Sequence, residues 1–267
     1  MTASLPMYDL PELVEATDAW WQGLRRHLSA TGVNGLPEQR EKPQNLVSHW
    51  LEEQPLLSQT CGYPLTRALA GRVQLVATPR YSAPGCAGAT YTSWVVVRNR
   101  DGIEEVEELR GKRVAFNGTD SQSGHNTLRT LIAPLAVGGT FFSAAVESGA
   151  HRRSMAMVQS GDADVAAVDC VSFALIARAA RDEVRGLKIL CATPAAPNLP
   201  YVTALATSAE DLERLRQGLA NAHADPALAG SRKTLMIEGC EVLPLGAYAV
   251  IPAMEQAAVA AGYPELR

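Results

Sequence analysis

The sequence predicts an α/β protein made of two lobes, one of them inserted into the other. Strand-like and helix-like runs alternate along most of the chain, and in the series that begins near Arg98 this alternation is typical of an α/β lobe with a mostly parallel sheet. Two runs rich in β-branched and aromatic residues, near 91–98 and 201–207, bracket the middle of this series. We therefore expect a first lobe formed by 1–94 and 203–267, and a second lobe formed by 95–202.

The predicted first lobe begins with a short strand at 4–8 and a helix that follows Asp9. Asp9 is a typical N-cap residue, and apolar residues then recur at helical spacing as far as Leu28. A polar loop rich in glycine and proline comes next. The chain then continues with predicted strands at 55–62, 73–81 and 91–99 and a helix at 63–71 that ends at Gly71.

The predicted second lobe continues the alternation of strands and helices. Its elements are strands at 110–116, 144–147, 163–169 and 187–193 and helices at 123–135, 151–159 and 170–183. The chain then returns to the first lobe through a strand at 200–207 and helices at 211–223 and 251–262. Ser208 and Asp211 form a predicted capping box at the first of these two helices.

The composition excludes several classes of protein. The 267 residues are 47% hydrophobic and 19% charged, with a net charge of -4 and no basic block. This is the composition of a globular protein. Nucleic-acid binding is not expected, because affinity for a phosphate backbone needs a positive surface. No apolar run is long enough to span a bilayer, so membrane insertion is not expected either.

The first residues and the cysteines bear on the compartment. The opening stretch, MTASLPMYDLPE, lacks the charged and apolar regions of a secretory signal. The five cysteines are scattered and contain no CxxC pair, which favours reduced thiols over a disulfide framework or a zinc site. We therefore expect a periplasmic protein if a signal has been removed, and a cytoplasmic protein otherwise.

The stretch FNGTDSQSGHN, which ends at Asn126, lies where a predicted strand gives way to a helix. A helix N-terminus offers unpaired N–H groups and a partial positive charge, and nearby hydroxyls can complete an anion site. Gly124 would let the backbone approach a ligand closely. The plainer interpretation is that Ser121 or Ser123 caps the helix. A cap needs only one such residue, so the cluster, which also contains Asp120, predicts an anion site.

This stretch is not a P-loop, because five residues separate Gly118 from Gly124 and no lysine follows. Two further strand-to-helix turns have a similar composition. QTCGYP, at 59–64, would present a second helix N-terminus, although an ordinary connection is the better interpretation of this motif alone. ESGAHRRS, at 147–154, places His151 near a helix start, where it could donate to an oxyanion or simply lie in solvent.

Asp169 ends the predicted strand in GDADVAAVD and precedes a helix. Its carboxylate could meet a ligand amine or hydroxyl, cap the following helix, or do both. Tyr8, Tyr63 and Tyr91 each lie at a predicted strand end or turn that would face the cleft between the lobes. For any one of them, half-buried packing with an exposed hydroxyl is the better interpretation.

Sequence motifs of enzymes are absent. The chain contains no GxSxG, HExxH or GxGxxG and no paired-carboxylate spacing. We therefore expect no catalytic residues, no metal site and no cofactor.

Six strings, in this order, carry a family likeness: SQTCGYPL, YTSWVVV, LRGKRVAFNGTDSQSGHN, ESGAH, GDADVAAVDC and PNLPYVTA. Together they resemble the phosphate, phosphite and phosphonate-binding proteins of ABC importers, the PhnD-like members of the type II periplasmic binding protein fold. The likeness extends from Ser4 to Tyr263. It implies two α/β lobes joined by two crossing strands, which close like a hinge on a ligand in the cleft between them.

The resemblance also implies roles for particular residues. Ser121, Ser123 and Gly124 would hold the oxygens of a phosphonate or phosphate, assisted by His151. Asp169, Tyr8 and Tyr91 would face the rest of the ligand, and Cys61 to Tyr63 would contribute from the opposite lobe. The candidate ligand-binding residues are therefore Tyr8, Cys61, Gly62, Tyr63, Tyr91, Ser93, Ser121, Gln122, Ser123, Gly124, His125, His151 and Asp169.

The sequence thus predicts a solute-binding protein that captures a small oxyanion by hinge closure, with an ABC permease as its expected partner. Two alternatives stay open on the same fold. One is a cytoplasmic enzyme similar to those of the futalosine route to menaquinone, with His125, His151 and Asp169 as the candidate acids or bases. The other is a cytoplasmic ligand sensor that passes its hinge state to a partner.

Overall fold

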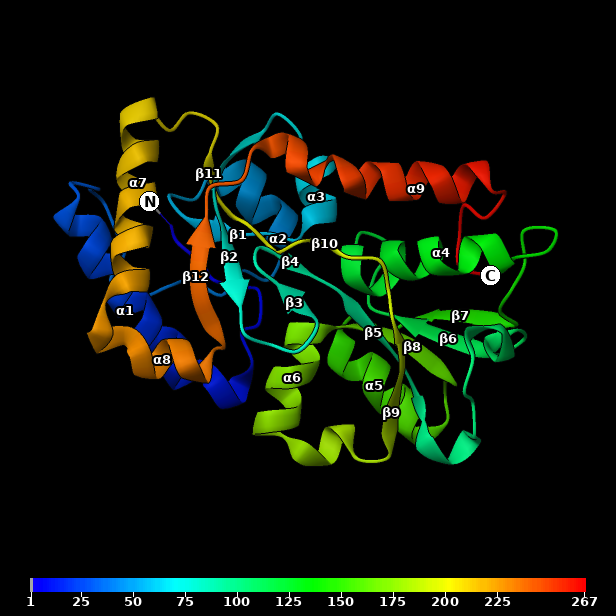
Figure 1. Cartoon of the computed structure of the whole chain (residues 1–267). Coiled ribbons are helices and arrows are strands. Elements are labelled where there is room, and N and C mark those ends of the chain that lie inside the picture. The colour runs from blue at the N-terminus through cyan, green and yellow to red at the C-terminus, as the bar shows by residue number, and fades with distance from the viewer. Residues whose placement is uncertain (1) are drawn as a thin grey trace. The chain divides into compact units, whose positions relative to one another are not determined.

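The computed structural model describes residues 2–267, which divide into two compact units. Unit 1 is formed by the chain up to Ser82, Ala87–Ala89 and Pro197–Ala247. Unit 2 is formed by Ala83–Cys86, Thr90–Ala196 and Tyr248–Arg267. Each unit combines helices with a sheet of its own, so the predicted α/β class is confirmed (Figure 1).

Unit 2 is built on a five-stranded sheet with the order β7-β6-β8-β5-β9. Its strands are β5 (Ser93–Arg98), β6 (Arg113–Phe116), β7 (Ala144–Glu147), β8 (Val165–Asp169) and β9 (Leu187–Ala192). β6 pairs in parallel with β7 and with β8, whereas β5 runs antiparallel to β8 and β9. The carboxyl ends of β6, β7 and β8 therefore lie at one edge of the sheet. The start of β5 lies there too, because Ser93 pairs with Asp169.

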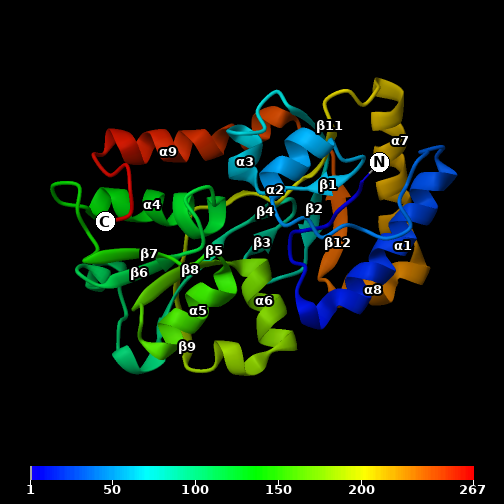
Figure 2. The same ribbon diagram turned by 180° about the vertical axis from the view of Figure 1, so that it is seen from behind.

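Helices cover both faces of this sheet (Figure 1). On one face lies α4 (Thr127–Ile132), which is itself covered by α9 (Val250–Ala260). On the other face lie α5 (His151–Ser160) and α6 (Cys170–Ala179), and Figure 2 shows the same order from behind. Unit 2 is therefore a layered α/β body in which the sheet is the central layer.

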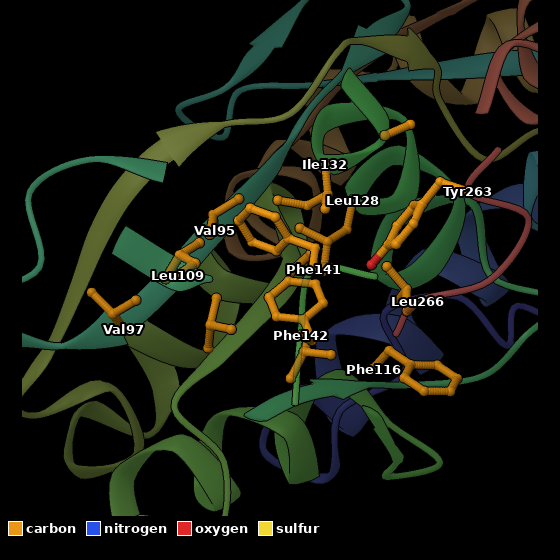
Figure 3. Packing of buried hydrophobic residues seen from close by; sticks show 14 of the residues in the cluster. Val95, Val97, Leu109, Phe116, Leu128, Ile132, Phe141, Phe142, Tyr263 and Leu266 are labelled. Atoms are coloured by element: carbon orange, nitrogen blue, oxygen red, sulfur yellow. The ribbon is translucent and has the colours of Figure 1, made fainter. Parts of the chain in front are cut away.

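The core of unit 2 lies between α4 and the sheet (Figure 3). Leu128 and Ile132 of α4 are fully buried and belong to one apolar cluster with Val95 of the sheet and with Phe141. Tyr263, which follows α9, belongs to the same cluster. Removal of this apolar surface from water fixes α4 on the sheet and thereby fixes the turn that precedes it.

The last helix, α9, is grouped with unit 2, whereas the sequence prediction places all of 203–267 in the N-terminal lobe. The side chain of Asn126 donates to the carbonyl of Ile251 (3.1 Å), and the buried Arg129 donates to the carbonyl of Pro264 (2.6 Å). Polar groups at the start of α4 need partners because they are buried. Those partners come from the far end of the chain, which periodicity along the sequence does not reveal.

Unit 1 contains a four-stranded antiparallel sheet with the order β1-β11-β2-β12. Its strands are β1 (Ser58–Gln59), β2 (Val73–Tyr81), β11 (Tyr201–Ala204) and β12 (Ile237–Glu241). Its helices are α1 (Val14–Ala30), α2 (Leu46–Ser48), α3 (Gly62–Thr66), α7 (Ala209–Ala224) and α8 (Ala229–Thr234). Helices α1 and α7 lie side by side (Figure 2), with Gly218 of α7 against Leu28 of α1. The predicted N-cap at Ser208 is confirmed, because its Oγ accepts from the N–H of Asp211 (3.0 Å).

The start of the chain differs from the prediction. Residues 2–7 form only isolated bridges, so the predicted strand at 4–8 is wrong. Pro6 has no N–H to donate, and Tyr8 adopts a left-handed conformation with φ of 62°, which a strand does not contain. Asp9 does not cap the first helix, because it pairs instead with Arg40 (2.6 Å).

Short elements complete the two units. Strands of two residues lie where the chain passes from one unit to the other: β3 (Cys86–Ala87), β4 (Thr90–Tyr91) and β10 (Ala196–Pro197). The 3-10 helices are η1 (Pro11–Leu13), η3 (Asn99–Asp101), η4 (Val106–Leu109), η6 (Ala133–Leu135), η7 (Arg181–Val184), η8 (Pro226–Leu228) and η9 (Leu245–Ala249). Two turns are π-helical, η2 (His49–Glu53) and η5 (Gln122–Asn126). Among residues 2–267, no helix has both the length and the apolar character needed to cross a membrane.

Leu128→Ala should lower the free energy of unfolding by about 2–5 kcal/mol, because it leaves a cavity between α4 and the sheet. Urea denaturation followed by circular dichroism measures this loss. Leu205→Ala, at a position that is 55% exposed, is the matched control and should change the free energy by less than about 0.5 kcal/mol. Equal losses in the two variants would contradict the placement of α4 on the core.

Candidate functional site

Three helices of unit 2 begin at the same edge of its sheet. β6 leads into the turn η5, which continues as α4, while β7 leads into α5 and β8 leads directly into α6. This edge therefore collects three sets of helix N–H groups that lack partners within their helices, each carrying a partial positive charge. An anion is the ligand that such an edge favours.

Ser121, Ser123 and His151 are joined by hydrogen bonds at this edge. The Oγ atom of Ser121 accepts from the backbone N–H of Gly124 (3.0 Å) and lies 3.4 Å from the Oγ atom of Ser123. Ser123 Oγ in turn lies 2.8 Å from Nε2 of His151, at the start of α5. Ser121 is thus the N-cap of the turn, as the plainer interpretation predicts. Ser123 is not used for that cap and links two of the three helix starts instead.

Gly124 is required by a close contact with Asn117. A Cβ atom at position 124 would lie 1.9 Å from Oδ1 of Asn117 and 3.1 Å from Cε1 of His151. The Oδ1 atom of Asn117 is buried and has no hydrogen-bond partner in the described part of the chain, 2–267. Asn117 directly follows β6 and is not among the residues that the sequence predicts. A buried polar atom of this kind at the site makes Asn117 a further candidate for ligand contact.

Burial keeps the two histidines of this region neutral. It lowers the pKa of His151 to about 4, although a hydrogen bond with the backbone carbonyl of Ala167 raises this pKa. It also lowers the pKa of His125 to about 4, and the positive charge of Arg129 acts in the same direction. A neutral His151 can donate its Nε2 proton to Ser123, or accept the proton of the Ser123 hydroxyl. In the first arrangement, the Ser123 hydroxyl is available to donate to an anion.

Gln122, His125 and Asn126 are buried and held by contacts within unit 2. Nε2 of Gln122 lies 3.2 Å from the sulfur of Met254, and Asn126 donates to Oε1 of Gln122 (2.8 Å). The rings of His125 and Phe116 have centroids 5.3 Å apart. These contacts hold the turn against α9 and the sheet. Contact of Gln122 or His125 with a ligand stays a prediction.

Asp169 lies at the same edge, at the end of β8. Its Oδ1 atom accepts from the N–H groups of Val171 (2.8 Å) and Ser172 (2.9 Å), so its predicted role as a cap is confirmed. Ser93 is its partner across the strands, and the buried Oγ of Ser93 has no hydrogen-bond partner within residues 2–267. Tyr91 is more deeply buried than the sequence predicts, at 2% exposure. A ligand-binding role for these residues stays a prediction.

The remaining candidates belong to unit 1. Cys61 precedes α3, and Gly62 and Tyr63 are the first residues of that helix. Tyr8 lines a small cavity of about 30 Å³ among mainly apolar and aromatic residues, and its ring meets that of Tyr81 edge-on at 5.2 Å. Its left-handed backbone conformation costs about 1–3 kcal/mol, and such conformations cluster at ligand sites.

One group of side chains in residues 2–267 could hold a metal ion by distance alone. The ligand atoms of Glu41, His49 and Glu53 lie within 4.8 Å of one another. His49 bonds Glu53 through Nδ1 (2.7 Å) and Ser4 through Nε2 (2.8 Å). A hydrogen bond between residues four apart, with His49 also bonded to a buried serine, therefore accounts for this arrangement.

Two α/β units and a sheet edge lined with helix N-termini and hydroxyls are typical of receptors for small anions. The model of one family, the periplasmic substrate-binding proteins of ABC phosphonate transporters, matches residues 5–242. The chain belongs to this family, and the predicted class of solute-binding protein is thereby confirmed.

Solved structures of other proteins have the same fold. A binding protein component of an ABC phosphonate transporter from Pseudomonas aeruginosa has a TM-score of 0.78 at 14% identity, covering 98% of this chain and 87% of that chain. PhnD1 from Prochlorococcus marinus, in complex with methylphosphonate, has a TM-score of 0.78 at 14% identity, covering 96% of each chain. XAC2383 from Xanthomonas citri, bound to chloride ion, has a TM-score of 0.72 at 13% identity over 98% of both chains. The predicted two-lobed fold is confirmed, while no curated protein sequence matches the chain.

Gly124→Ala should lower the free energy of unfolding by about 1–3 kcal/mol, because the new Cβ cannot coexist with Asn117 at 1.9 Å. Gly230→Ala is the matched control, since no atom lies within 4 Å of its Cβ position and alanine favours the helix. Urea denaturation of both variants measures the difference. If Gly124→Ala proves as stable as the parent protein, Asn117 does not lie over Gly124.

The stability of the protein should fall as the pH falls from about 6.5 to about 4. His125 and His151 are neutral in the folded state down to about pH 4, whereas in the unfolded chain they take up protons below about 6.5. Protons therefore favour unfolding within this window, and the full stability is present above it. Urea midpoints from pH 7.5 to 4.5 test this, and His125→Phe should show a shallower decline. An unchanged decline in that variant would exclude His125 as a contributor.

Proposed function

We propose that this chain binds a phosphonate, or a phosphorus oxyanion of similar shape, at the carboxyl edge of the unit 2 sheet. The observation that carries the proposal is the hydrogen-bonded pair of Ser123 and His151, at 2.8 Å, where three helices begin. The hydroxyls of Ser121 and Ser123 and the N–H groups of the turn hold the oxygens of the ligand, and His151 assists by orienting the Ser123 hydroxyl. We infer the class of ligand from PhnD1, which shares this fold and whose structure is a complex with methylphosphonate.

The chemistry of the edge suits an oxyanion without requiring a cationic side chain. The chain carries a net charge of -4, so its overall field repels an anion and the local site must offset this. Helix N-termini and hydroxyl donors supply directed hydrogen bonds to oxygen atoms, and bonds to a charged acceptor are stronger than neutral ones. A neutral His151 that donates its single proton to Ser123 turns the Ser123 hydroxyl towards the anion, without the cost of burying a charge.

The other candidates complete the ligand site in this proposal. Asp169, Ser93 and Tyr91 face the part of the ligand that is not the oxyanion. Tyr8 and the turn of Cys61, Gly62 and Tyr63 stay candidate ligand contacts in unit 1.

We also propose that the chain acts by binding alone and delivers its ligand to an ABC permease, in a periplasmic role. The pair of Ser123 and His151 has the spacing of a nucleophile and its base. A histidine with a pKa of about 4 is, however, a weak base at neutral pH. The group that raises the pKa of His151 is the backbone carbonyl of Ala167, and burial lowers this pKa by more. These two properties favour a receptor over the enzyme alternative.

Ser123→Ala should weaken binding of methylphosphonate by about 10–100-fold, because it removes one hydrogen bond to a charged group and leaves His151 unpaired. Isothermal titration calorimetry on ligand-stripped protein measures this, with phosphite, phosphate, an aminoalkyl phosphonate and sulfate as competitors. Ser160→Ala, an exposed serine at the other end of α5, is the matched control and should bind normally. Undiminished affinity in Ser123→Ala, or release of phosphate from the ligand by the parent protein, would overturn the proposal.

A further inference from the structure

Two cysteines of unit 2 lie in contact although 84 positions separate them. The Sγ atoms of Cys86 and Cys170 are 3.6 Å apart. Cys86 lies in β3 and is half-buried, whereas Cys170 is the first residue of α6 and is fully buried. Both are free thiols. The sequence offers no sign of this pair, because the five cysteines are scattered along the chain.

The backbone holds the two cysteines together independently of their side chains. The N–H of Cys170 donates to the carbonyl of Thr92 (3.1 Å), and the N–H of Thr92 donates to the carbonyl of Gly85 (3.1 Å). Gly85 has a φ of +96°, and a Cβ atom there would lie 2.9 Å from Cβ of Cys170. Only a glycine lets the loop before Cys86 approach the start of α6 this closely. The contact is therefore a property of the fold rather than of one side-chain rotamer.

We propose that Cys86 and Cys170 are a disulfide site, at which oxidation joins β3 to the start of α6 and stabilises unit 2. The sulfur atoms must approach by about 1.5 Å to reach bonding distance, which rotation of the cysteine side chains can supply. The family to which the chain belongs is periplasmic, and disulfides form and persist in that compartment. The inference does not depend on the identity of the ligand.

The oxidation can be written with oxidised glutathione as the electron acceptor. The half-buried thiol of Cys86 loses its proton to solvent, and its sulfur attacks one sulfur of the glutathione disulfide, releasing one glutathione thiolate. The Cys170 thiol then gives up its proton and attacks the Cys86 sulfur, which releases the second glutathione. Two protein thiols are oxidised by two electrons, and one glutathione disulfide is reduced to two thiols. The hydrogen bond with Cys86, together with burial, raises the pKa of Cys170, so Cys86 is the residue that reacts first.

The position of the pair gives the bond two consequences. It closes a loop of 84 residues, and a cross-link over a long loop restricts the unfolded chain strongly. It also fastens the segment that ends at Cys86, beyond which the chain enters unit 1 at Ala87. Cys170 directly follows Asp169, so oxidation fixes one boundary of the polar sheet edge in place.

The test compares oxidised and reduced forms of the whole chain under native conditions. The reduced protein is incubated with oxidised glutathione at pH 8, alkylated, digested without reductant and mapped by mass spectrometry. We expect one linked pair of peptides, those of Cys86 and Cys170, and a loss of two of the five thiols that react in denaturant. The melting temperature of the oxidised form should be higher than that of the reduced form.

Variants with a single substitution distinguish a disulfide between Cys86 and Cys170 from unspecific oxidation of other cysteines. Cys86→Ser should abolish the link and the difference in melting temperature, whereas Cys191→Ser, at another half-buried cysteine, should preserve both. Because Cys170 is fully buried, Cys86→Ser carries the test if Cys170→Ser does not fold. Separate alkylation of the two cysteines after oxidation would overturn the proposal. So would a linkage of Cys86 to another cysteine, or a melting temperature that oxidation leaves unchanged or lowers.

Discussion

The parallel pairing of β6 with β7 and β8 is the constraint on which the polar edge of unit 2 depends. Parallel neighbours end at the same side of a sheet, so each must be followed by a connection that starts there. In this chain each connection leads into a helix. The starts of these three helices therefore lie at the same side of the sheet although they are far apart in the sequence. Ser123 and His151 meet because their strands are paired, and they would be separated if the order of strands changed.

The turn that carries the serines is held from behind by buried polar groups rather than by apolar packing alone. Asn126 bonds Gln122 within the turn and Ile251 of α9, and Arg129 bonds Asn126 (2.7 Å). Because Asn126 is shared by all of these bonds, the network favours a single position for the turn. An anion site built from backbone N–H groups needs such rigidity, because donors that must be reoriented bind weakly.

The sequence predicts local features of this protein well and long-range features poorly. The cluster Ser121, Ser123 and Gly124 and the cap Asp169 lie within short strings, and these strings in order were sufficient to predict the family and the two-lobed fold. The contact between Asn117 and Gly124 is invisible in the sequence, because a glycine gives no sign of what lies over its α-carbon. The placement of α9 is invisible for the same reason, since an apolar helical face does not specify its partner. The ligand contacts of individual residues stay predictions.

The return of α9 to unit 2 also sets an order of events during synthesis. Asn126 is synthesised well before Ile251, whose carbonyl accepts a hydrogen bond from the Asn126 side chain. Nearly the whole chain must therefore emerge before the polar edge acquires its support. Until then Asn126 and Arg129 lack the partners that they find at Ile251 and Pro264. The support of the polar edge is thus completed by the position of a single helix at the end of the chain.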